Sequence, residues 1–187
     1  MFKKYRFRDF DYRLVILVLI ASALGIMAVN SANESYTERQ IMGVAIGFAA
    51  MMITAFIDYS FVLRLYWLMY LGICGLLAVT TYSSLGDDTK GAQRWIDIGP
   101  IRFQPSELAK IILILFFAQF FMKHKKKLNK ITTLIFAGIL FIIPAYMIFD
   151  QPDLSTTIII VTIFCAILFA GGLSWRYIIA AFAIVIP

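Results

Sequence analysis

Long, predominantly apolar runs recur along this chain and limit the folds that it can adopt. The runs cover residues 14–29, 41–57, 61–80, 108–122, 131–149 and 154–173, and a seventh starts at Tyr177 and is cut off at Pro187. Each complete run is about as long as a helix that crosses the ~30 Å hydrocarbon core of a bilayer. Because the runs are continuously apolar rather than alternating, helices are favoured over the strands of a membrane barrel. The sequence therefore predicts an all-α, polytopic transmembrane helix bundle with six complete spans and a truncated seventh.

Composition and charge agree with a membrane protein. Hydrophobic residues make up 61% of the 187 residues and charged residues 15%, against roughly a quarter charged in soluble domains. With the N-terminus placed in the cytoplasm, twelve of the 17 Lys and Arg residues fall on inner segments and four in outer loops. The positive-inside rule therefore predicts a multi-pass protein with a cytoplasmic N-terminus. The net charge of +6 then reflects topology and does not indicate nucleic-acid binding.

The basic run KHKKKLNK, residues 123–130, falls in a predicted inner loop. It is typical of a segment that binds the anionic lipids of the inner leaflet, so membrane lipids are expected partners. The two cysteines, Cys74 and Cys165, lie within apolar runs without metal-ligand spacing, and we interpret them as packing residues. No composition shift or linker divides the chain, so residues 1–187 are predicted to form one membrane domain.

Two of the predicted spans start with the same pattern, in which glutamine and proline precede an acid. The stretches are Gln104-Pro105-Ser106-Glu107 and Gln151-Pro152-Asp153. Each places proline at a first helical position and an acid in the first turn. Both helices begin at the predicted outer face, where their N-terminal N–H groups can hold an anion. Alternatively, Glu107 and Asp153 only complement their own helix dipoles, an effect of about 0.3 to 1 kcal/mol each.

Lys110 lies roughly one helical turn inside the predicted membrane boundary. Because it follows Glu107 by three residues, the two side chains share a helix face. An ionisable residue at this depth is a functional candidate, since its charge must be paired or face water. The alternative is a snorkelling lysine that only pairs with Glu107.

The preceding outer loop adds two arginines and a tryptophan. In RWIDIGPIRFQP, the Asp-x-Gly-Pro turn lets Trp95 lie at headgroup level while Arg94 and Arg102 point at an anion. Trp95 alone is equally typical of an interfacial aromatic belt. Taken with Lys110 and the two helix starts, the arginines indicate binding of a phosphorylated or pyrophosphate-bearing amphiphile from the outer leaflet.

Two stretches, GAQRWIDIGPIRFQPSELAK and the later QPDLSTT, closely resemble the SEDS family of bacterial membrane proteins (FtsW/RodA/SpoVE). Their residues are more similar to those of the rod-shape branch than to those of the division branch. The resemblance covers the whole chain in order. It implies a peptidoglycan glycosyltransferase of the bacterial cytoplasmic membrane that polymerises lipid II at the outer face during cell-wall elongation and rod-shape maintenance. It also implies a class B penicillin-binding protein as the transpeptidase partner.

The resemblance also suggests roles for individual residues. Trp95 matches a loop tryptophan that is important for activity, and Glu107, Lys110 and Asp153 match polar residues of the central cavity. The catalytic aspartate of the family lies in an outer loop after the seventh span, so it is expected beyond Pro187 and no catalytic residue is assigned here. Electrostatics assign Arg94 and Arg102 to substrate phosphate, with a divalent metal ion as a further candidate source of positive charge.

Two other functions fit a polar cavity in a multispan bundle. One is a transporter (flippase) of lipid-linked precursors, which predicts charges that continue into the inner half of the spans. The run 108–122 contains only Lys110 and Gln119 as polar residues, so no continuous path is evident. The other is a noncatalytic scaffold for the transpeptidase, and the Gly43-x-x-x-Gly47 spacing is one candidate helix-packing face.

Overall fold

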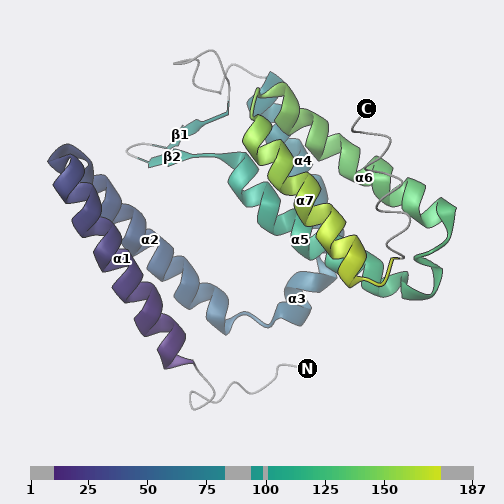
Figure 1. The fold of residues 1–187 in the computed structure, drawn as a ribbon, viewed down its shortest axis with the longest axis horizontal. Coiled ribbons are helices and arrows are strands. Elements are labelled where there is room, and N and C mark those ends of the chain that lie inside the picture. The colour runs from purple at the N-terminus through teal and green to yellow at the C-terminus, as the bar shows by residue number, and fades with distance from the viewer. Residues whose placement is uncertain (1–10, 83–93, 99–100, 174–187) are drawn as a thin grey trace. The chain divides into compact units, whose positions relative to one another are not determined.

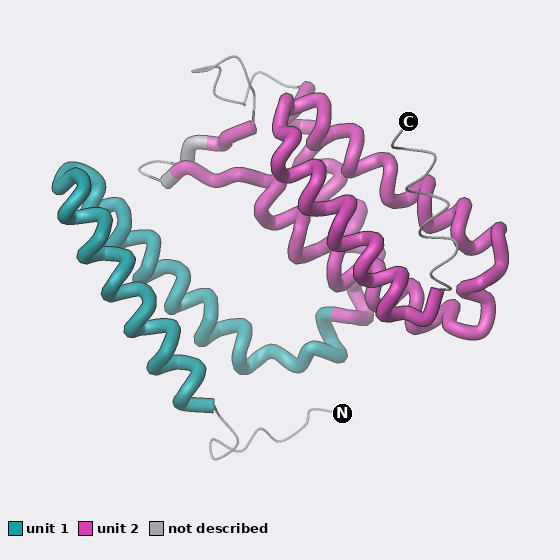
Figure 2. Tube along the Cα trace, in the orientation of Figure 1, with its two compact units in different colours: residues 1–62, 99–101 teal, residues 63–98, 102–187 magenta. Residues whose placement is uncertain are grey.

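A computed structural model describes residues 11–82, 94–98 and 101–173, and these residues form two compact units (Figure 2). The first unit contains residues 1–62 and 99–101, and the second contains residues 63–98 and 102–187. The single membrane domain expected for residues 1–187 stays a prediction.

The first unit is built on a pair of consecutive apolar helices, α1 (Tyr12–Ala32) and α2 (Thr37–Phe56), joined by the short 3-10 helix η2 (Glu34–Tyr36) (Figure 1). Asp11 begins α1 because its carboxylate accepts hydrogen bonds from two N–H groups of the first turn. Asn33 ends α1 in an extended conformation, and its side chain caps η2. The Thr37 hydroxyl donates to Asn30 Oδ1 at 3.0 Å, which ties the start of α2 to the end of α1.

The second unit is a bundle of four helices, α4 (Tyr66–Tyr82), α5 (Pro105–Lys123), α6 (Ile131–Asp150) and α7 (Leu154–Ala170). Two three-residue strands, β1 (Ile96–Ile98) and β2 (Ile101–Phe103), pair just before α5, and the 3-10 helix η3 (Lys125–Lys127) connects α5 to α6. We call the end where α4 and α6 finish and α5 and α7 begin the polar end. The opposite end, which carries the lysines of residues 123–130, is the basic end.

Aromatic side chains of α5 form the centre of this bundle. They are buried and follow one another at helical spacing: Phe116, Phe117, Phe120 and Phe121. The Phe116 ring stacks on Tyr70 of α4 with 4.4 Å between centroids, and Phe117 meets Phe164 of α7 edge to face at 4.8 Å. The Tyr70 hydroxyl also donates to the Leu140 carbonyl of α6 at 2.8 Å. The aromatic stripe of α5 thus fixes how the four helices pack.

The predicted all-α helix bundle is confirmed, and the small β1–β2 sheet is an addition within a predicted loop. Among the described residues, four helices are long and apolar enough to cross a membrane, while α4 and α7 are apolar but have 17 residues each. The expected third span, 61–80, is divided at Leu65 into α3 (Tyr59–Arg64) and α4. The apolar run did not predict this break because it continues on both sides of Arg64 and Leu65, and the one charge at Arg64 does not by itself end a helix. The seventh run, from Tyr177, lies outside the described residues.

Replacing Phe116 with alanine is expected to destabilise the bundle strongly. The side chain is fully buried and touches aromatic rings of α4 and of α5 itself, so its removal leaves a cavity that costs about 3 kcal/mol or more. Thermal unfolding of the protein in detergent measures the effect. The matched control is Phe149→Ala on α6, whose side chain is 57% exposed. Equal loss of stability in the two variants would contradict a core centred on α5.

Candidate functional site

Asp153 organises the polar end of the bundle from its place at the start of α7. As the N-cap, it accepts hydrogen bonds at Oδ1 from the Thr156 N–H at 3.0 Å and from the Ser155 hydroxyl at 2.9 Å. Its Oδ2 accepts from the Thr156 hydroxyl at 2.8 Å. The residue is only 4% exposed, so these donors replace water around a buried carboxylate.

The start of α7 differs from the sequence prediction in one respect. Proline at the first helical position is observed for α5, where Pro105 takes that place and Glu107 lies in the first turn. For α7 the prediction is wrong, because Pro152 precedes the N-cap and Asp153 is itself the cap. A carboxylate one position before the helix can accept the free N–H groups directly, which a first-turn acid does less well.

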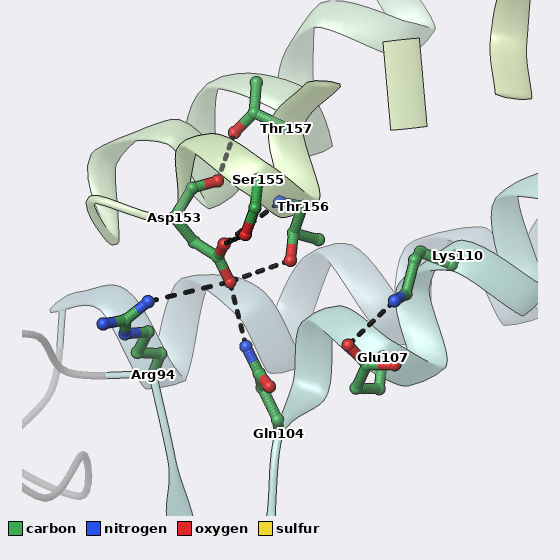
Figure 3. A network of polar contacts seen from close by, with 8 residues as sticks. All are labelled: Arg94, Gln104, Glu107, Lys110, Asp153, Ser155, Thr156 and Thr157. Carbon is green, nitrogen blue, oxygen red and sulfur yellow. Dashed lines mark hydrogen bonds and ion pairs between the residues drawn. The ribbon is translucent and has the colours of Figure 1, made fainter. Parts of the chain in front are cut away.

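Two side chains from outside α7 reach the same carboxylate (Figure 3). Gln104 Nε2 donates to Asp153 Oδ2 at 3.0 Å, and the Arg94 guanidinium lies 3.9 Å from that oxygen. Arg94 lies just before β1 and Gln104 directly follows β2. Because paired antiparallel strands return the chain to its starting point, the β1–β2 sheet explains how residues ten positions apart meet at one acid.

Glu107 and Lys110 form a second ion pair in the first turns of α5, with 2.8 Å between Lys110 Nζ and Glu107 Oε1. The side chain of Lys110 is 21% exposed and that of Glu107 is 57% exposed. The spacing of three residues places both on one face of α5. The predicted pair is therefore present in the structure, and its lysine is the more shielded partner.

The environment of Asp153 favours its charged form. Burial on its own raises the pKa of Asp153, but the hydrogen bonds from Thr156 and Ser155 and the nearby Arg94 guanidinium outweigh it, and the pKa lies below the ordinary 3.8. A neutral carboxyl group would lose these charge-assisted bonds. Asp153 is therefore an acceptor that holds its neighbours in place.

Trp95 directly precedes the small sheet, and Arg102 is part of it. Trp95 is half-buried immediately before β1, and Arg102 is exposed in the middle of β2. The structure thus brings Arg94 to Asp153 and Lys110 to Glu107, and it places Trp95 and Arg102 on the hairpin that carries Arg94.

The role of the two glutamines in the repeated helix-start pattern was not predicted from the sequence. Gln104 does not cap its own helix with its side chain, and its amide reaches Asp153 instead. Gln151 donates from Nε2 to the Thr81 hydroxyl of α4 at 2.8 Å. The sequence signal for both glutamines is the repetition of Gln-Pro before an acid.

The residues that the structure describes do not fit a bound metal ion. No group of three or more His, Cys, Asp and Glu side chains within the described ranges is placed to hold one. Both oxygens of Asp153 already accept hydrogen bonds, and Glu107 faces an ammonium group.

The arrangement is suited to binding an anion at the polar end. Arg94 and Lys110 supply two cations, each oriented by its own carboxylate. The N-termini of α5 and α7 add partial positive charge at the same end. Two separated cations match a group with more than one phosphate better than a single carboxylate.

Sequence comparison decides the family. The model of the FtsW/RodA/SpoVE family, described as a cell cycle protein, matches residues 10–187. The chain belongs to this family. The peptidoglycan glycosyltransferase MrdB of Escherichia coli strain K12 is 35% identical over 174 residues, which are 92% of this chain and 46% of that protein. The peptidoglycan glycosyltransferase RodA of Treponema pallidum is 29% identical over 188 residues, covering 95% of this chain and 42% of that protein.

Solved structures agree with this family assignment. The crystal structure of the rod-shape-determining protein RodA of Thermus thermophilus matches with a TM-score of 0.79 at 26% identity, covering 96% of this chain and 60% of that one. A chain from a structure that describes polymerization and crosslinking by a peptidoglycan synthase complex matches with a TM-score of 0.78 at 26% identity, covering 95% and 53%. The chain spans about half the length of the curated family members it matches.

Replacing Asp153 with asparagine is expected to reduce acid sensitivity. Because the pKa of Asp153 is lowered by folding, its carboxylate stabilises the protein fully above about pH 4, and this contribution is lost as pH falls through the lower folded pKa. Asparagine still caps α7 but cannot titrate. The stability advantage of the wild type, measured by thermal unfolding in detergent from about pH 7 down to about pH 3, should therefore shrink on acidification.

Asp153→Ala serves as the comparison, because it also removes the cap and should cost about 1 kcal/mol more at neutral pH. Parallel pH profiles for the wild type and Asp153→Asn would show that the charge of Asp153 does not stabilise the fold.

Proposed function

We propose that the complete protein is a peptidoglycan glycosyltransferase that polymerises lipid II at the outer face of the bacterial cytoplasmic membrane during cell-wall elongation and rod-shape maintenance. Its relatives MrdB and RodA carry the name peptidoglycan glycosyltransferase. The structural observation that carries the proposal is the pair of cations at the polar end, Arg94 and Lys110, each held by a carboxylate.

The reaction needs such cations on the leaving group. A hydroxyl oxygen of one lipid-linked disaccharide bonds to the anomeric carbon of another, and the bond from that carbon to the lipid pyrophosphate breaks. The pyrophosphate leaves with the bonding electrons, and the hydroxyl proton passes to a general base. Arg94, Lys110 and the N-termini of α5 and α7 stabilise the negative charge that develops on the pyrophosphate.

We assign the acids of the site to orienting the two cations and not to proton transfer. Asp153 accepts hydrogen bonds at both oxygens and holds Arg94, while Glu107 holds Lys110. We assign the general base, from the family resemblance, to an aspartate outside the sequence described. In this proposal Arg102 adds a second guanidinium from β2, and Trp95 either braces the segment that carries Arg94 or stacks on a sugar.

Charge placement supports the orientation of this site. The 19 residues of α5 run from Pro105 at the polar end to Lys123 at the basic end, a length of about 28 Å. By the positive-inside rule the lysine-rich end faces the cytoplasm. The polar end and its cations then face the outer leaflet, where lipid II is used, and the N-terminus lies in the cytoplasm.

A class B penicillin-binding protein is the proposed partner. Glycan strands must be crosslinked after polymerisation, and one structural relative belongs to a structure whose subject is the coordination of polymerization and crosslinking by a peptidoglycan synthase complex. A polymerase that lacks the chemistry of crosslinking would need a transpeptidase close to its product.

Removing either cation should slow glycan synthesis. Arg94→Gln and Lys110→Met are each expected to lower the polymerisation rate of the purified complete protein roughly a hundredfold, because one fewer charge stabilises the departing pyrophosphate. The rate is measured as the formation of glycan strands from lipid II. The matched control is Lys126→Met, which removes an exposed charge at the basic end and should leave the rate unchanged.

Two results would contradict this assignment. Wild-type rates in both cation variants would show that Arg94 and Lys110 do not act on the leaving group. If the protein instead moved labelled lipid II between the leaflets of vesicles without polymerising it, the transporter interpretation would replace the polymerase.

A further inference from the structure

We infer that Gln104 is a positioning residue that holds the two cations of the site in register for one pyrophosphate. The inference rests on the proposed function. Gln104 lies outside the set of charged residues from which the site was first predicted, yet its amide joins the start of α5 to the cap of α7. It carries no charge, so it acts through geometry alone.

The contacts of Gln104 show how it fixes α5. Its backbone is extended, as expected for an N-cap, and its carbonyl accepts the Glu107 N–H at 3.1 Å. Its side chain makes no cap bond to α5 and donates instead to Asp153 Oδ2 at 3.0 Å. The first turn of α5, which carries Glu107 and leads to Lys110, is therefore tied to the N-terminus of α7 through one residue.

The same carboxylate oxygen also determines where Arg94 lies. Asp153 Oδ2 receives the Gln104 amide at 3.0 Å and has the Arg94 guanidinium at 3.9 Å (Figure 3). One buried atom thus links the helix that carries Lys110 to the segment that carries Arg94. If the amide is lost, both cations keep their charge, but the start of α5 loses its hydrogen bond to the oxygen beside which Arg94 lies.

This arrangement predicts that two single substitutions each lower activity and that combining them restores it. Gln104→Glu places a second carboxylate beside Asp153, where two negative charges repel each other. Asp153→Asn removes the acceptor charge that orients Arg94. Combining the two changes exchanges donor and acceptor: the introduced asparagine can cap α7 and donate to the introduced glutamate, and that glutamate can pair with Arg94. The double variant also has the same net charge as the wild type.

The experiment measures polymerisation kinetics on lipid II with the purified complete protein. We expect Gln104→Glu and Asp153→Asn each to lower kcat roughly tenfold or more, with a smaller change in KM, because misplaced cations act mainly on the transition state. The double variant should recover to within about threefold of the wild type. A further variant, Gln104→Met, keeps the side-chain length but removes the hydrogen-bond donor, and its kcat is measured in the same way. Thermal unfolding of every variant shows whether a loss of activity follows from a loss of stability.

A kcat for Gln104→Met equal to that of the wild type would overturn the inference. A double variant no more active than the product of the single effects would overturn it as well. If all variants lost activity only in proportion to their thermal stability, Gln104 would be structural and not a positioning residue.

The polymerase assignment can be wrong while the positioning role of Gln104 is right, and a binding experiment separates the two. A wild-type protein that binds a prenyl diphosphate but does not polymerise lipid II would overturn the polymerase assignment alone. The wild type, the two single variants and the double variant would then be compared by their affinity for prenyl diphosphate. Rescue of affinity in the double variant would support the positioning role of Gln104, and its absence would overturn it.

Discussion

The buried Asp153 carboxylate is the interaction on which the polar end of this bundle depends. A charge with 4% exposure is unfavourable in a helix bundle unless donors surround it. The N-terminus of α7, two hydroxyl groups, the Gln104 amide and the Arg94 guanidinium supply that environment. These donors come from three separate parts of the chain, so satisfying one acid fixes their relative positions.

The polar end is joined to the apolar core through a second set of contacts. Gln151, just before the α7 cap, donates to Thr81 near the end of α4, and the aromatic side chains of α5 pack against α4 and α7 below it. Packing among the spans gives the bundle its rigidity, because apolar side chains gain little from leaving lipid and association relies on close contact and hydrogen bonds. The polar network can then be placed accurately at the end of a stiff support.

Much of this architecture could be predicted from sequence, and the failures have physical reasons. Span length and continuous hydrophobicity are set by the bilayer, so the helices were predicted well. The break at Leu65 was not, because apolar residues continue on both sides of it and only the single charge of Arg64 marks the position. Glu107 and Lys110 could be paired because they are neighbours on one helix, whereas the contact between Gln104 and Asp153 joins residues 49 positions apart. Sequence spacing carries no information about such a pair until the packing of α5 against α7 is known.

The two ion pairs, Arg94 with Asp153 and Lys110 with Glu107, can each release their cation to a bound anion. Lys110 sits 2.8 Å from a carboxylate that is more than half exposed, so water can solvate Glu107 if its partner turns toward an anion. Arg94 lies 3.9 Å from an acid that already accepts bonds from neutral donors, so Asp153 remains satisfied if Arg94 moves. Glu107 stays in contact with water and Asp153 keeps the hydrogen bonds of its neutral donors, which reduces the penalty for opening either ion pair. Under the proposed function, the pyrophosphate recruits both cations while the hydrogen bond that holds α5 to α7 stays intact.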